Sequence, residues 1–122
     1  MNIMENTVSE KSIAFSIRLI KLYKILTEER KEYILSKQLL RSGTAIGALI
    51  REAEHAQSKA DFLNKMNIAL KEANENDYWI LLLYRGEFIQ EKEYLSVSED
   101  CNELIKMLVK IVKTTKENLG RQ

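Results

Sequence analysis

The absence of proline constrains this chain most, because proline is the residue that most strongly ends or bends a helix. None of the 122 residues is proline, and only four are glycine. Ala, Leu, Lys, Glu and Ile are frequent throughout. No segment alternates apolar and polar residues between turn signals, as the strands of a sheet would. The sequence therefore predicts an all-α fold.

The apolar pattern divides into four segments of helical period, which are expected as helices over residues 8–26, 35–55, 59–85 and 97–119. Ser58 stands three residues before Asp61, a weaker relative of the capping box. Ser96 and Glu99 form a complete capping box, which favours a helix start there. Gly86 is expected to end the third helix. The short connections favour antiparallel neighbours, so residues 1–122 are predicted to form a single up-down-up-down antiparallel four-helix bundle.

Three features indicate how these helices would pack. The first helix carries a broad apolar stripe of the kind that faces a core; it comprises Ile13, Ile17, Leu19, Ile20 and Tyr23. In the second helix, Gly43 and Gly47 lie four residues apart on one face, which permits a close approach by another helix. The end of the third helix reads YWILLLY and is apolar all round. Such a segment must be covered on more than one side.

The composition fits an ordinary globular protein, with 45% hydrophobic and 30% charged residues. No run approaches the roughly 18 apolar residues of a membrane span, and the first residues do not resemble a secretion signal. Cys101 is the one cysteine, so no internal disulfide is possible, which suits a reducing cytoplasm. The formal net charge of +1 gives no general reason to expect nucleic acid.

Two motifs that contain glutamate resemble parts of enzyme active sites. Glu52 and His55 have the Glu-x-x-His spacing of di-metal bundles, which need two such pairs and two further glutamates. His55 is the only histidine, and a histidine near a helix C-terminus is favoured by the helix dipole alone. Glu72 and Glu75 could serve as an acid–base pair, but the sequence offers them no partner base. We therefore expect no enzyme, no metal and no cofactor.

Basic residues line two of the expected helices. Four lysines share about a third of the circumference of the fourth helix: Lys106, Lys110, Lys113 and Lys116. Lys11, Arg18 and Lys21 line one side of the first helix. These helices are neighbours in the simplest bundle, so the two rows could merge into a face that grips phosphates. Alternatively, the lysines solvate an outer face and complement the C-terminal dipole of the fourth helix.

The central stretch QLLRSGTAIGALIREAEHAQSKADFLNKMNIALKEANENDYW resembles the bacterial four-helix-bundle family of proteins encoded in intervening sequences of 23S ribosomal RNA genes. The matching positions are Gln38, Leu39, Arg41, Ser42, Ile46, Ile50, Glu52, Asp61, Phe62, Ala69, Glu72 and Glu75. The likeness spans about Val8 to Leu119. It implies a small bundle without enzymatic activity that assembles into rings, commonly pentamers. Related accessory proteins of diversity-generating retroelements bind a reverse transcriptase and nucleic acid through a basic surface, whereas this chain is close to neutral.

Three positions depart from the family pattern, and all three have turned apolar. Ala45 stands where the pattern has serine, Leu49 where it has asparagine, and Leu81 where near relatives carry glutamate. If Leu49 and Leu81 face outward, they add to an exposed apolar patch, which marks an association surface. Natural drift would produce this pattern, and so would deliberate redesign of a ring-forming scaffold to bury a new interface.

The sequence thus predicts a cytoplasmic, non-enzymatic scaffold protein that assembles with copies of itself, as a pentamer, and that could also bind another protein. Aromatic and leucine side chains of apolar segments are the expected interface, since aromatic residues are favoured interface anchors. They are Leu49, Trp79, Leu81, Leu82 and Tyr84. The alternative is a nucleic-acid-binding accessory protein. Its basic residues would be Arg18, Lys21, Lys106, Lys110, Lys113 and Lys116.

Overall fold

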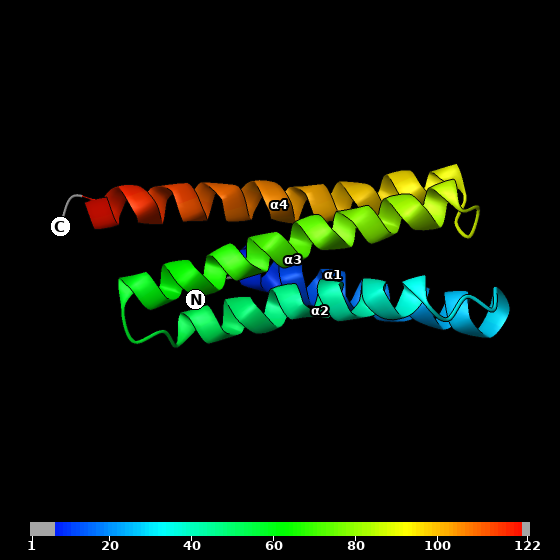
Figure 1. The fold of residues 1–122 in the computed structure, drawn as a ribbon, viewed down its shortest axis with the longest axis horizontal. Helices are drawn as coiled ribbons and strands as arrows, with labels where there is room; N and C mark the ends of the chain where they lie inside the picture. Colours follow the sequence, from blue (N-terminus) through cyan, green and yellow to red (C-terminus); the bar gives the residue numbers. More distant parts are fainter. Residues whose placement is uncertain (1–6, 121–122) are drawn as a thin grey trace.

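The computed structural model describes residues 7–120 and confirms the predicted all-α up-down four-helix bundle. Its helices are α1 (Val8–Lys24), α2 (Leu35–Glu54), α3 (Lys59–Arg85) and α4 (Glu91–Gly120), with a π-helical turn, η2 (Ile25–Glu29), directly after α1. Successive helices run in opposite directions, and α3 and α4 are the longest (Figure 1). Within residues 7–120, no helix is both long enough and apolar enough to cross a membrane.

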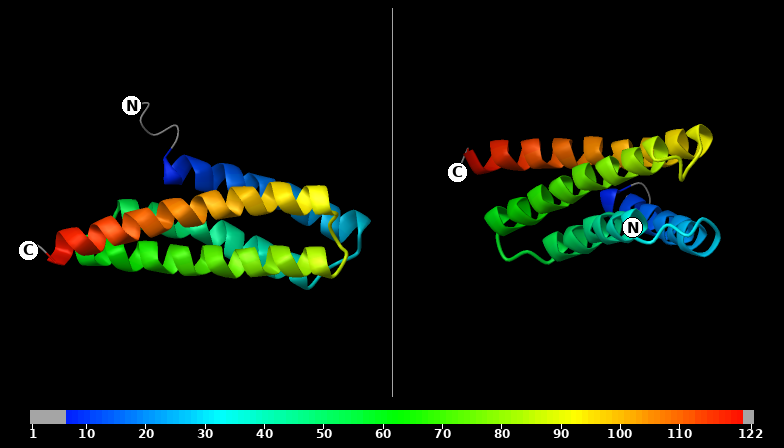
Figure 2. Two further views of the ribbon diagram at one scale, coloured as in Figure 1. Left: turned by 90° about the horizontal axis from the view of Figure 1, so that it is seen from above. Right: turned by 45° about the vertical axis from the view of Figure 1, so that its right-hand side comes forward.

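The connections alternate between the two ends of the bundle. The turn after α1 and the turn between α3 and α4 lie at one end, and the link between α2 and α3 lies at the other (Figure 2). Each connection is short, so each helix folds back along the one before it. The starts of α2 and α4 therefore lie at the same end as the turn that follows α1.

Side-chain oxygens cap the starts of three helices. Thr7 Oγ1 accepts the Glu10 N–H at 3.3 Å at the start of α1, and Ser58 Oγ accepts the Asp61 N–H at 3.0 Å at the start of α3. The start of α2 is capped by a buried carboxylate, that of Glu32. It accepts the backbone N–H groups of Ile34, Leu35 and Ser36 at 3.1, 3.0 and 2.6 Å. These bonds satisfy donors that a helix start leaves unpaired.

The predicted start of the fourth helix at Ser96 is wrong, because α4 begins at Glu91 and Ser96 lies inside it. The helix starts where Glu93 reaches back to accept the Gln90 N–H at 2.9 Å, which is the second half of a capping box. Arg30, which follows η2, holds the turn between α3 and α4 in place. Its guanidinium donates to both Glu93 carboxylate oxygens at 3.1 and 2.9 Å and to the Phe88 carbonyl at 2.7 Å.

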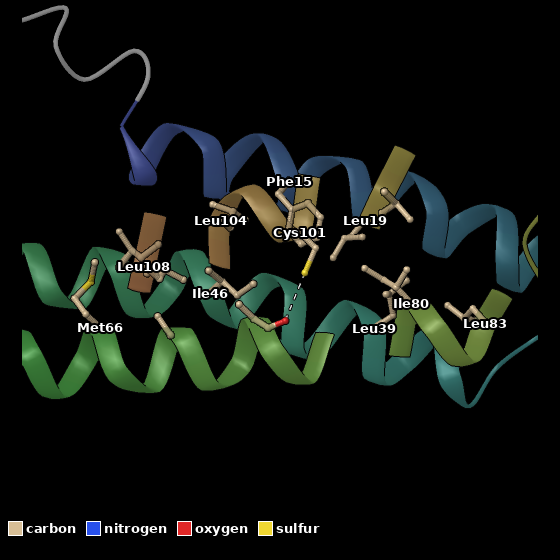
Figure 3. Packing of buried hydrophobic residues seen from close by; sticks show 14 of the residues in the cluster. Phe15, Leu19, Leu39, Ile46, Met66, Ile80, Leu83, Cys101, Leu104 and Leu108 are labelled. Carbon is tan, nitrogen blue, oxygen red and sulfur yellow. Dashed lines mark hydrogen bonds between the residues drawn. The ribbon is translucent and has the colours of Figure 1, made fainter. Parts of the chain in front are cut away.

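The core runs along the axis of the bundle and draws on all four helices (Figure 3). Its fully buried side chains include Leu19 of α1, Leu39 and Ile46 of α2, Ile80 and Leu83 of α3, and Leu104 and Leu108 of α4. The close approach predicted at the glycines of α2 is confirmed. A Cβ at Gly43 would collide with Leu19 of α1, and one at Gly47 would lie 3.2 Å from Ser12 Oγ.

The apolar stripe expected to face the core from the first helix does so at Leu19, but the prediction is wrong for its three isoleucines. Phe15 and Leu19 are buried, but Ile13, Ile17 and Ile20 are 46%, 49% and 41% exposed. The reason is that α1 has apolar residues on two adjacent faces. Ser12, Phe15 and Leu19 occupy the face that α2 and α4 cover, which leaves the isoleucines on the outer face.

Candidate functional site

The five residues predicted to form an oligomer interface are half-buried within the single subunit. Leu49, Trp79 and Tyr84 pack against the core cluster. Trp79 also meets Tyr78 edge-on, with ring centroids 5.3 Å apart, and Tyr84 stacks on Tyr94 of α4 at 4.3 Å. The subunit therefore covers part of each of these side chains and leaves part uncovered. Since Leu49 and Leu81 are half-buried, neither belongs to the most exposed apolar surface.

A polar network joins α2 to α3 on the outer side of their contact. The Arg41 guanidinium donates to the carboxylates of Glu72 and Glu75, and its Nε donates to Gln38 Oε1 at 2.9 Å. Trp79 Nε1 donates to Glu75 Oε2 at 2.9 Å. This bond and the positive charge of Arg41 outweigh partial burial and lower the pKa of Glu75. Glu72 and Glu75 are thus held together by one arginine, an arrangement that ties the two helices.

The Glu-x-x-His pair lies on the surface, where α2 ends. Glu52 and His55 are both exposed, and Glu52 pairs with Lys65 of α3 at 3.5 Å. Across residues 7–120, no three side chains of the types His, Cys, Asp and Glu gather closely enough to hold a metal ion.

The two basic rows do not merge, because α4 meets α1 through acidic residues. Lys11 pairs with Glu103 at 2.6 Å. Arg18 donates to Asp100 at 2.6 Å and to Ser96 Oγ at 2.8 Å. Arg18 is therefore held by α4, and these carboxylates stand along the line where the basic rows would have to join. The four lysines of α4 are exposed.

Other apolar side chains on the helices are more exposed. They are Ile13, Ile17 and Ile20 of α1, Ile68 and Tyr78 of α3, and Leu95 and Val109 of α4. Two places among them were missed by sequence reasoning. The first, which we call the isoleucine face, consists of Ile13, Ile17 and Ile20 on α1. Beside it a groove of about 260 Å³ runs between α1 and α2. Its lining residues are Ser9, Ile13, Ser16, Ile17, Thr44, Gly47, Ala48 and Arg51. Gly47 and Ala48 are the small residues of α2 in this lining.

The second place, which we call the Leu95 patch, consists of Leu95 with Glu91 and Glu99 on the N-terminal half of α4. Leu95 is 57% exposed, and both glutamates are exposed. The α4 residues that bond to α1 and its following turn are Glu93, Ser96, Asp100 and Glu103, so Leu95 lies on a different side of the helix. Val97 and Cys101 are buried, and at the period of a helix Leu95 does not share their face. This spacing is the sequence signal that Leu95 faces outward.

Comparison with known proteins identifies the family of the chain and a similar solved structure. The sequence pattern of the 23S rRNA-intervening sequence protein family matches residues 4–110, which is most of the chain. The chain belongs to this family. It is also similar to a solved structure from Bacteroides thetaiotaomicron, described as a protein with unknown function from the S23 ribosomal protein family. The two are 57% identical, with a TM-score of 0.86, and the match covers 87% of this chain and 95% of that one. None of the curated proteins matches.

The motif that carries the resemblance to the 23S rRNA-intervening sequence proteins serves the contact between α2 and α3. Gln38, Arg41, Glu72 and Glu75 form the polar network that joins these helices. Ser42 lies beneath it, where its Oγ accepts a hydrogen bond from the buried Asn76 Nδ2 at 3.0 Å. The motif residues therefore fix how two helices of the family fold pack, and their positions do not by themselves identify a reactive centre.

Proposed function

We propose that this member of the 23S rRNA-intervening sequence protein family is a non-enzymatic, cytoplasmic assembly protein whose copies bind one another. The isoleucine face is the observation that carries the proposal. Single exposed apolar residues are common on soluble proteins, but Ile13, Ile17 and Ile20 follow one side of α1 over two turns. They adjoin a groove that is already open. A contiguous apolar surface of this kind marks an association site.

The residues predicted from the sequence have a place in this proposal. Leu49, Trp79, Leu81, Leu82 and Tyr84 are half-buried in one subunit, so further burial on assembly would contribute to association. The resemblance noted in the sequence favours a pentameric ring. The apolar side chains of Ala45, Leu49 and Leu81 are compatible with such a ring, whether they arose by drift or by redesign.

The test is the mass of the wild-type chain in solution, measured by light scattering after size exclusion over a range of concentrations. The subunit mass is 14.2 kDa. A mass near five times this value supports the ring, and another stable multiple supports assembly with a different subunit number. A monomer at all concentrations up to about 100 µM would contradict the proposal, because a specific interface usually gives a Kd well below that value.

The lysines of α4 favour a second candidate function, the binding of nucleic acid. Lys106, Lys110, Lys113 and Lys116 are exposed, and within residues 7–120 none of them pairs with a carboxylate. Of the two residues predicted on α1, Lys21 is exposed, whereas Arg18 is held by Asp100. The C-terminal half of α4 would therefore carry this function.

Its test is RNA and DNA binding as a function of salt. Replacing the four α4 lysines by glutamine should weaken binding and reduce the steepness of log K against log salt. The reduction should be roughly 0.7 to 0.9 for each phosphate that the variant no longer neutralises. The matched control replaces four exposed lysines elsewhere: Lys31, Lys37, Lys71 and Lys92. No retention by the wild type at low salt, or an equal effect of the control, would exclude this function.

A further inference from the structure

We propose that the isoleucine face of one copy receives the Leu95 patch of the next copy, in a head-to-tail contact. This inference rests on the proposed function and deepens it, because it names the two surfaces that meet. Three properties of the subunit support it: the exposure of two different surfaces, the volume and lining of the groove, and the charges around both surfaces.

The subunit exposes apolar side chains on more than one helix, and the isoleucine face and the Leu95 patch are two different surfaces of this kind. Ile17 on α1 is 49% exposed and Leu95 on α4 is 57% exposed. A two-fold contact of the isoleucine face with itself would leave Leu95 uncovered. A head-to-tail contact covers both faces with one kind of interface, and such contacts build closed rings or open chains.

The groove has a volume of about 260 Å³, which is enough for a single branched side chain. Gly47 and Ala48 are small residues that line it from α2, and Ile13 and Ile17 line it from α1. Leu95 projects from a regular helix, with residues four before and four after it on the same side. A leucine from a partner helix would bury apolar surface on both sides, and such a contact follows the ridges-into-grooves pattern of helix packing.

The charges around the two surfaces are complementary. Glu91 and Glu99 stand four residues to either side of Leu95, and about 12 Å separates them along the helix. Arg51 lines one end of the groove, while Lys21 and Lys24 follow the isoleucines at the other end. The three isoleucines between these ends span about 10.5 Å of α1. Among residues 7–120, Arg51 has no carboxylate partner, so it is available to one from another copy.

The test uses two single variants, Ile17→Asp and Leu95→Asp, each at an exposed position outside the core. In a head-to-tail assembly each variant disables one of the two surfaces, so each alone should run as a monomer of 14.2 kDa. Mixed in equal amounts, they should form a heterodimer of twice that mass, because each variant supplies the surface that the other lacks. Circular dichroism and urea unfolding check that both variants are folded. Ile68→Asp, at an exposed position of α3 outside both surfaces, is the matched control and should keep the wild-type mass.

In the proposed contact Glu99 faces Arg51, and Glu91 faces Lys21 and Lys24. Charge reversal tests this pairing. Glu99→Arg should weaken assembly by about tenfold or more in the dissociation constant, because it places two positive charges together. The added change Arg51→Glu should restore most of the affinity. A double variant that assembles no more tightly than Glu99→Arg alone would overturn this pairing.

The outcomes separate the two proposals. If the wild type is a monomer, the proposed function and this inference both fail. If the wild type assembles but Leu95→Asp still forms a symmetric dimer, the isoleucine face binds itself and this inference alone is overturned. Unchanged masses for both variants would likewise overturn it and leave the assembly function intact.

Discussion

Glu87 holds a left-handed backbone conformation just after the end of α3. Gly86 ends the helix as the sequence predicts, and its φ is −82°, whereas Glu87 has a φ of 68°. The Glu87 N–H donates to the Tyr84 carbonyl at 3.0 Å, and the Phe88 N–H donates to the Leu83 carbonyl at 2.8 Å. These two bonds form a Schellman motif, in which the residue after the C-cap is left-handed. A non-glycine residue is strained there.

Replacing Glu87 by glycine should therefore stabilise the protein. We expect the free energy of unfolding to rise by about 0.5 to 1 kcal/mol, because glycine adopts a positive φ without the steric cost of a Cβ. Urea unfolding followed by circular dichroism measures the change. Arg85→Gly, two residues earlier and still inside α3, should lower the same quantity by up to about 1 kcal/mol. Destabilisation by Glu87→Gly would show that the conformation costs nothing here.

Glu32 should make the stability of the bundle depend on acidic pH. Burial raises the pKa of its carboxyl, but the N–H groups of Leu35, Ser36 and Ile34 lower it, and the net effect is a pKa below its ordinary value of 4.5. A carboxylate with a lowered folded pKa stabilises fully above its unfolded pKa. That stabilisation is lost as the pH falls through the folded value.

The matching variant is Glu32→Gln, which keeps the shape but removes the charge at the start of α2. At pH 7 we expect a loss of about 1 to 2 kcal/mol in the free energy of unfolding, the size of a strong helix cap. The difference from the wild type should shrink below about pH 4.5. Glu28→Gln changes an exposed carboxylate nearby and should cost little at either pH. A deficit that is constant from pH 7 to pH 3 would mean that the charge of Glu32 contributes nothing.

At the scale of the helices, the contact between α1 and α2 depends on a glycine that the sequence pattern identifies. A Cβ at Gly43 would overlap Leu19, whose side chain is fully buried, and would lie 3.0 Å from Asn76 Nδ2. We expect Gly43→Ala to lower the free energy of unfolding by about 1 to 3 kcal/mol through overpacking. Alanine favours a helix by up to about 1 kcal/mol over glycine, so the propensity works against this loss.

Gly47→Ala is the matched control for this contact. Its Cβ would lie 3.2 Å from the Oγ of Ser12, a small buried side chain of α1, so helix propensity and crowding should nearly cancel. Thermal or urea unfolding of the two variants gives the comparison. An equal effect of both substitutions would show that the helices can separate without cost at Gly43.

The helices themselves could be predicted, but which face of each is buried could not. The period of the apolar residues, together with Ser58, predicts α3 and its start. In α1 the apolar residues follow two faces, and only the position of α2 and α4 decides that Leu19 is inside and Ile17 outside. The start of α4 likewise depends on a distant residue, Arg30, whose bonds to Glu93 and Phe88 lie outside any local pattern.

For the whole molecule, the candidate surfaces depend on which face of each helix is buried. The lysines of α4 could be predicted as exposed from their spacing alone. The acids that separate them from Arg18 could not, since Asp100 meets Arg18 across 82 positions of sequence. Sequence reasoning missed the Leu95 patch because the capping box at Ser96 predicts a helix start there. A helix that starts at Ser96 would leave Leu95 in a loop. Once α4 begins at Glu91, Leu95 becomes an exposed helix residue between two acids.

Cys101 can report on the opening of the whole molecule, because its thiol lies in the centre of the core (Figure 3). Burial, together with the charges of Asp77 and Asp100, raises the pKa of the thiol to about 12, and its Sγ donates to the Ala73 carbonyl at 3.5 Å. The reactive thiolate is therefore nearly absent in the folded state. At pH 8 we expect labelling by an aromatic disulfide reagent to be at least about 1,000-fold slower than in urea, since it requires unfolding.

The dependence of the Cys101 labelling rate on protein concentration tests whether the folded chain assembles. If copies bind one another when folded, assembly lowers the unfolded fraction by mass action, so the labelling rate of the wild type should fall as protein concentration rises. Ile17→Asp should label at a rate that does not depend on concentration, because this variant alone does not assemble. The substitution lies on the surface and leaves the surroundings of Cys101 untouched. Gly43→Ala should label faster than the wild type at every concentration. A wild-type rate that does not change with concentration would argue that the folded chain gains no stability from its own copies.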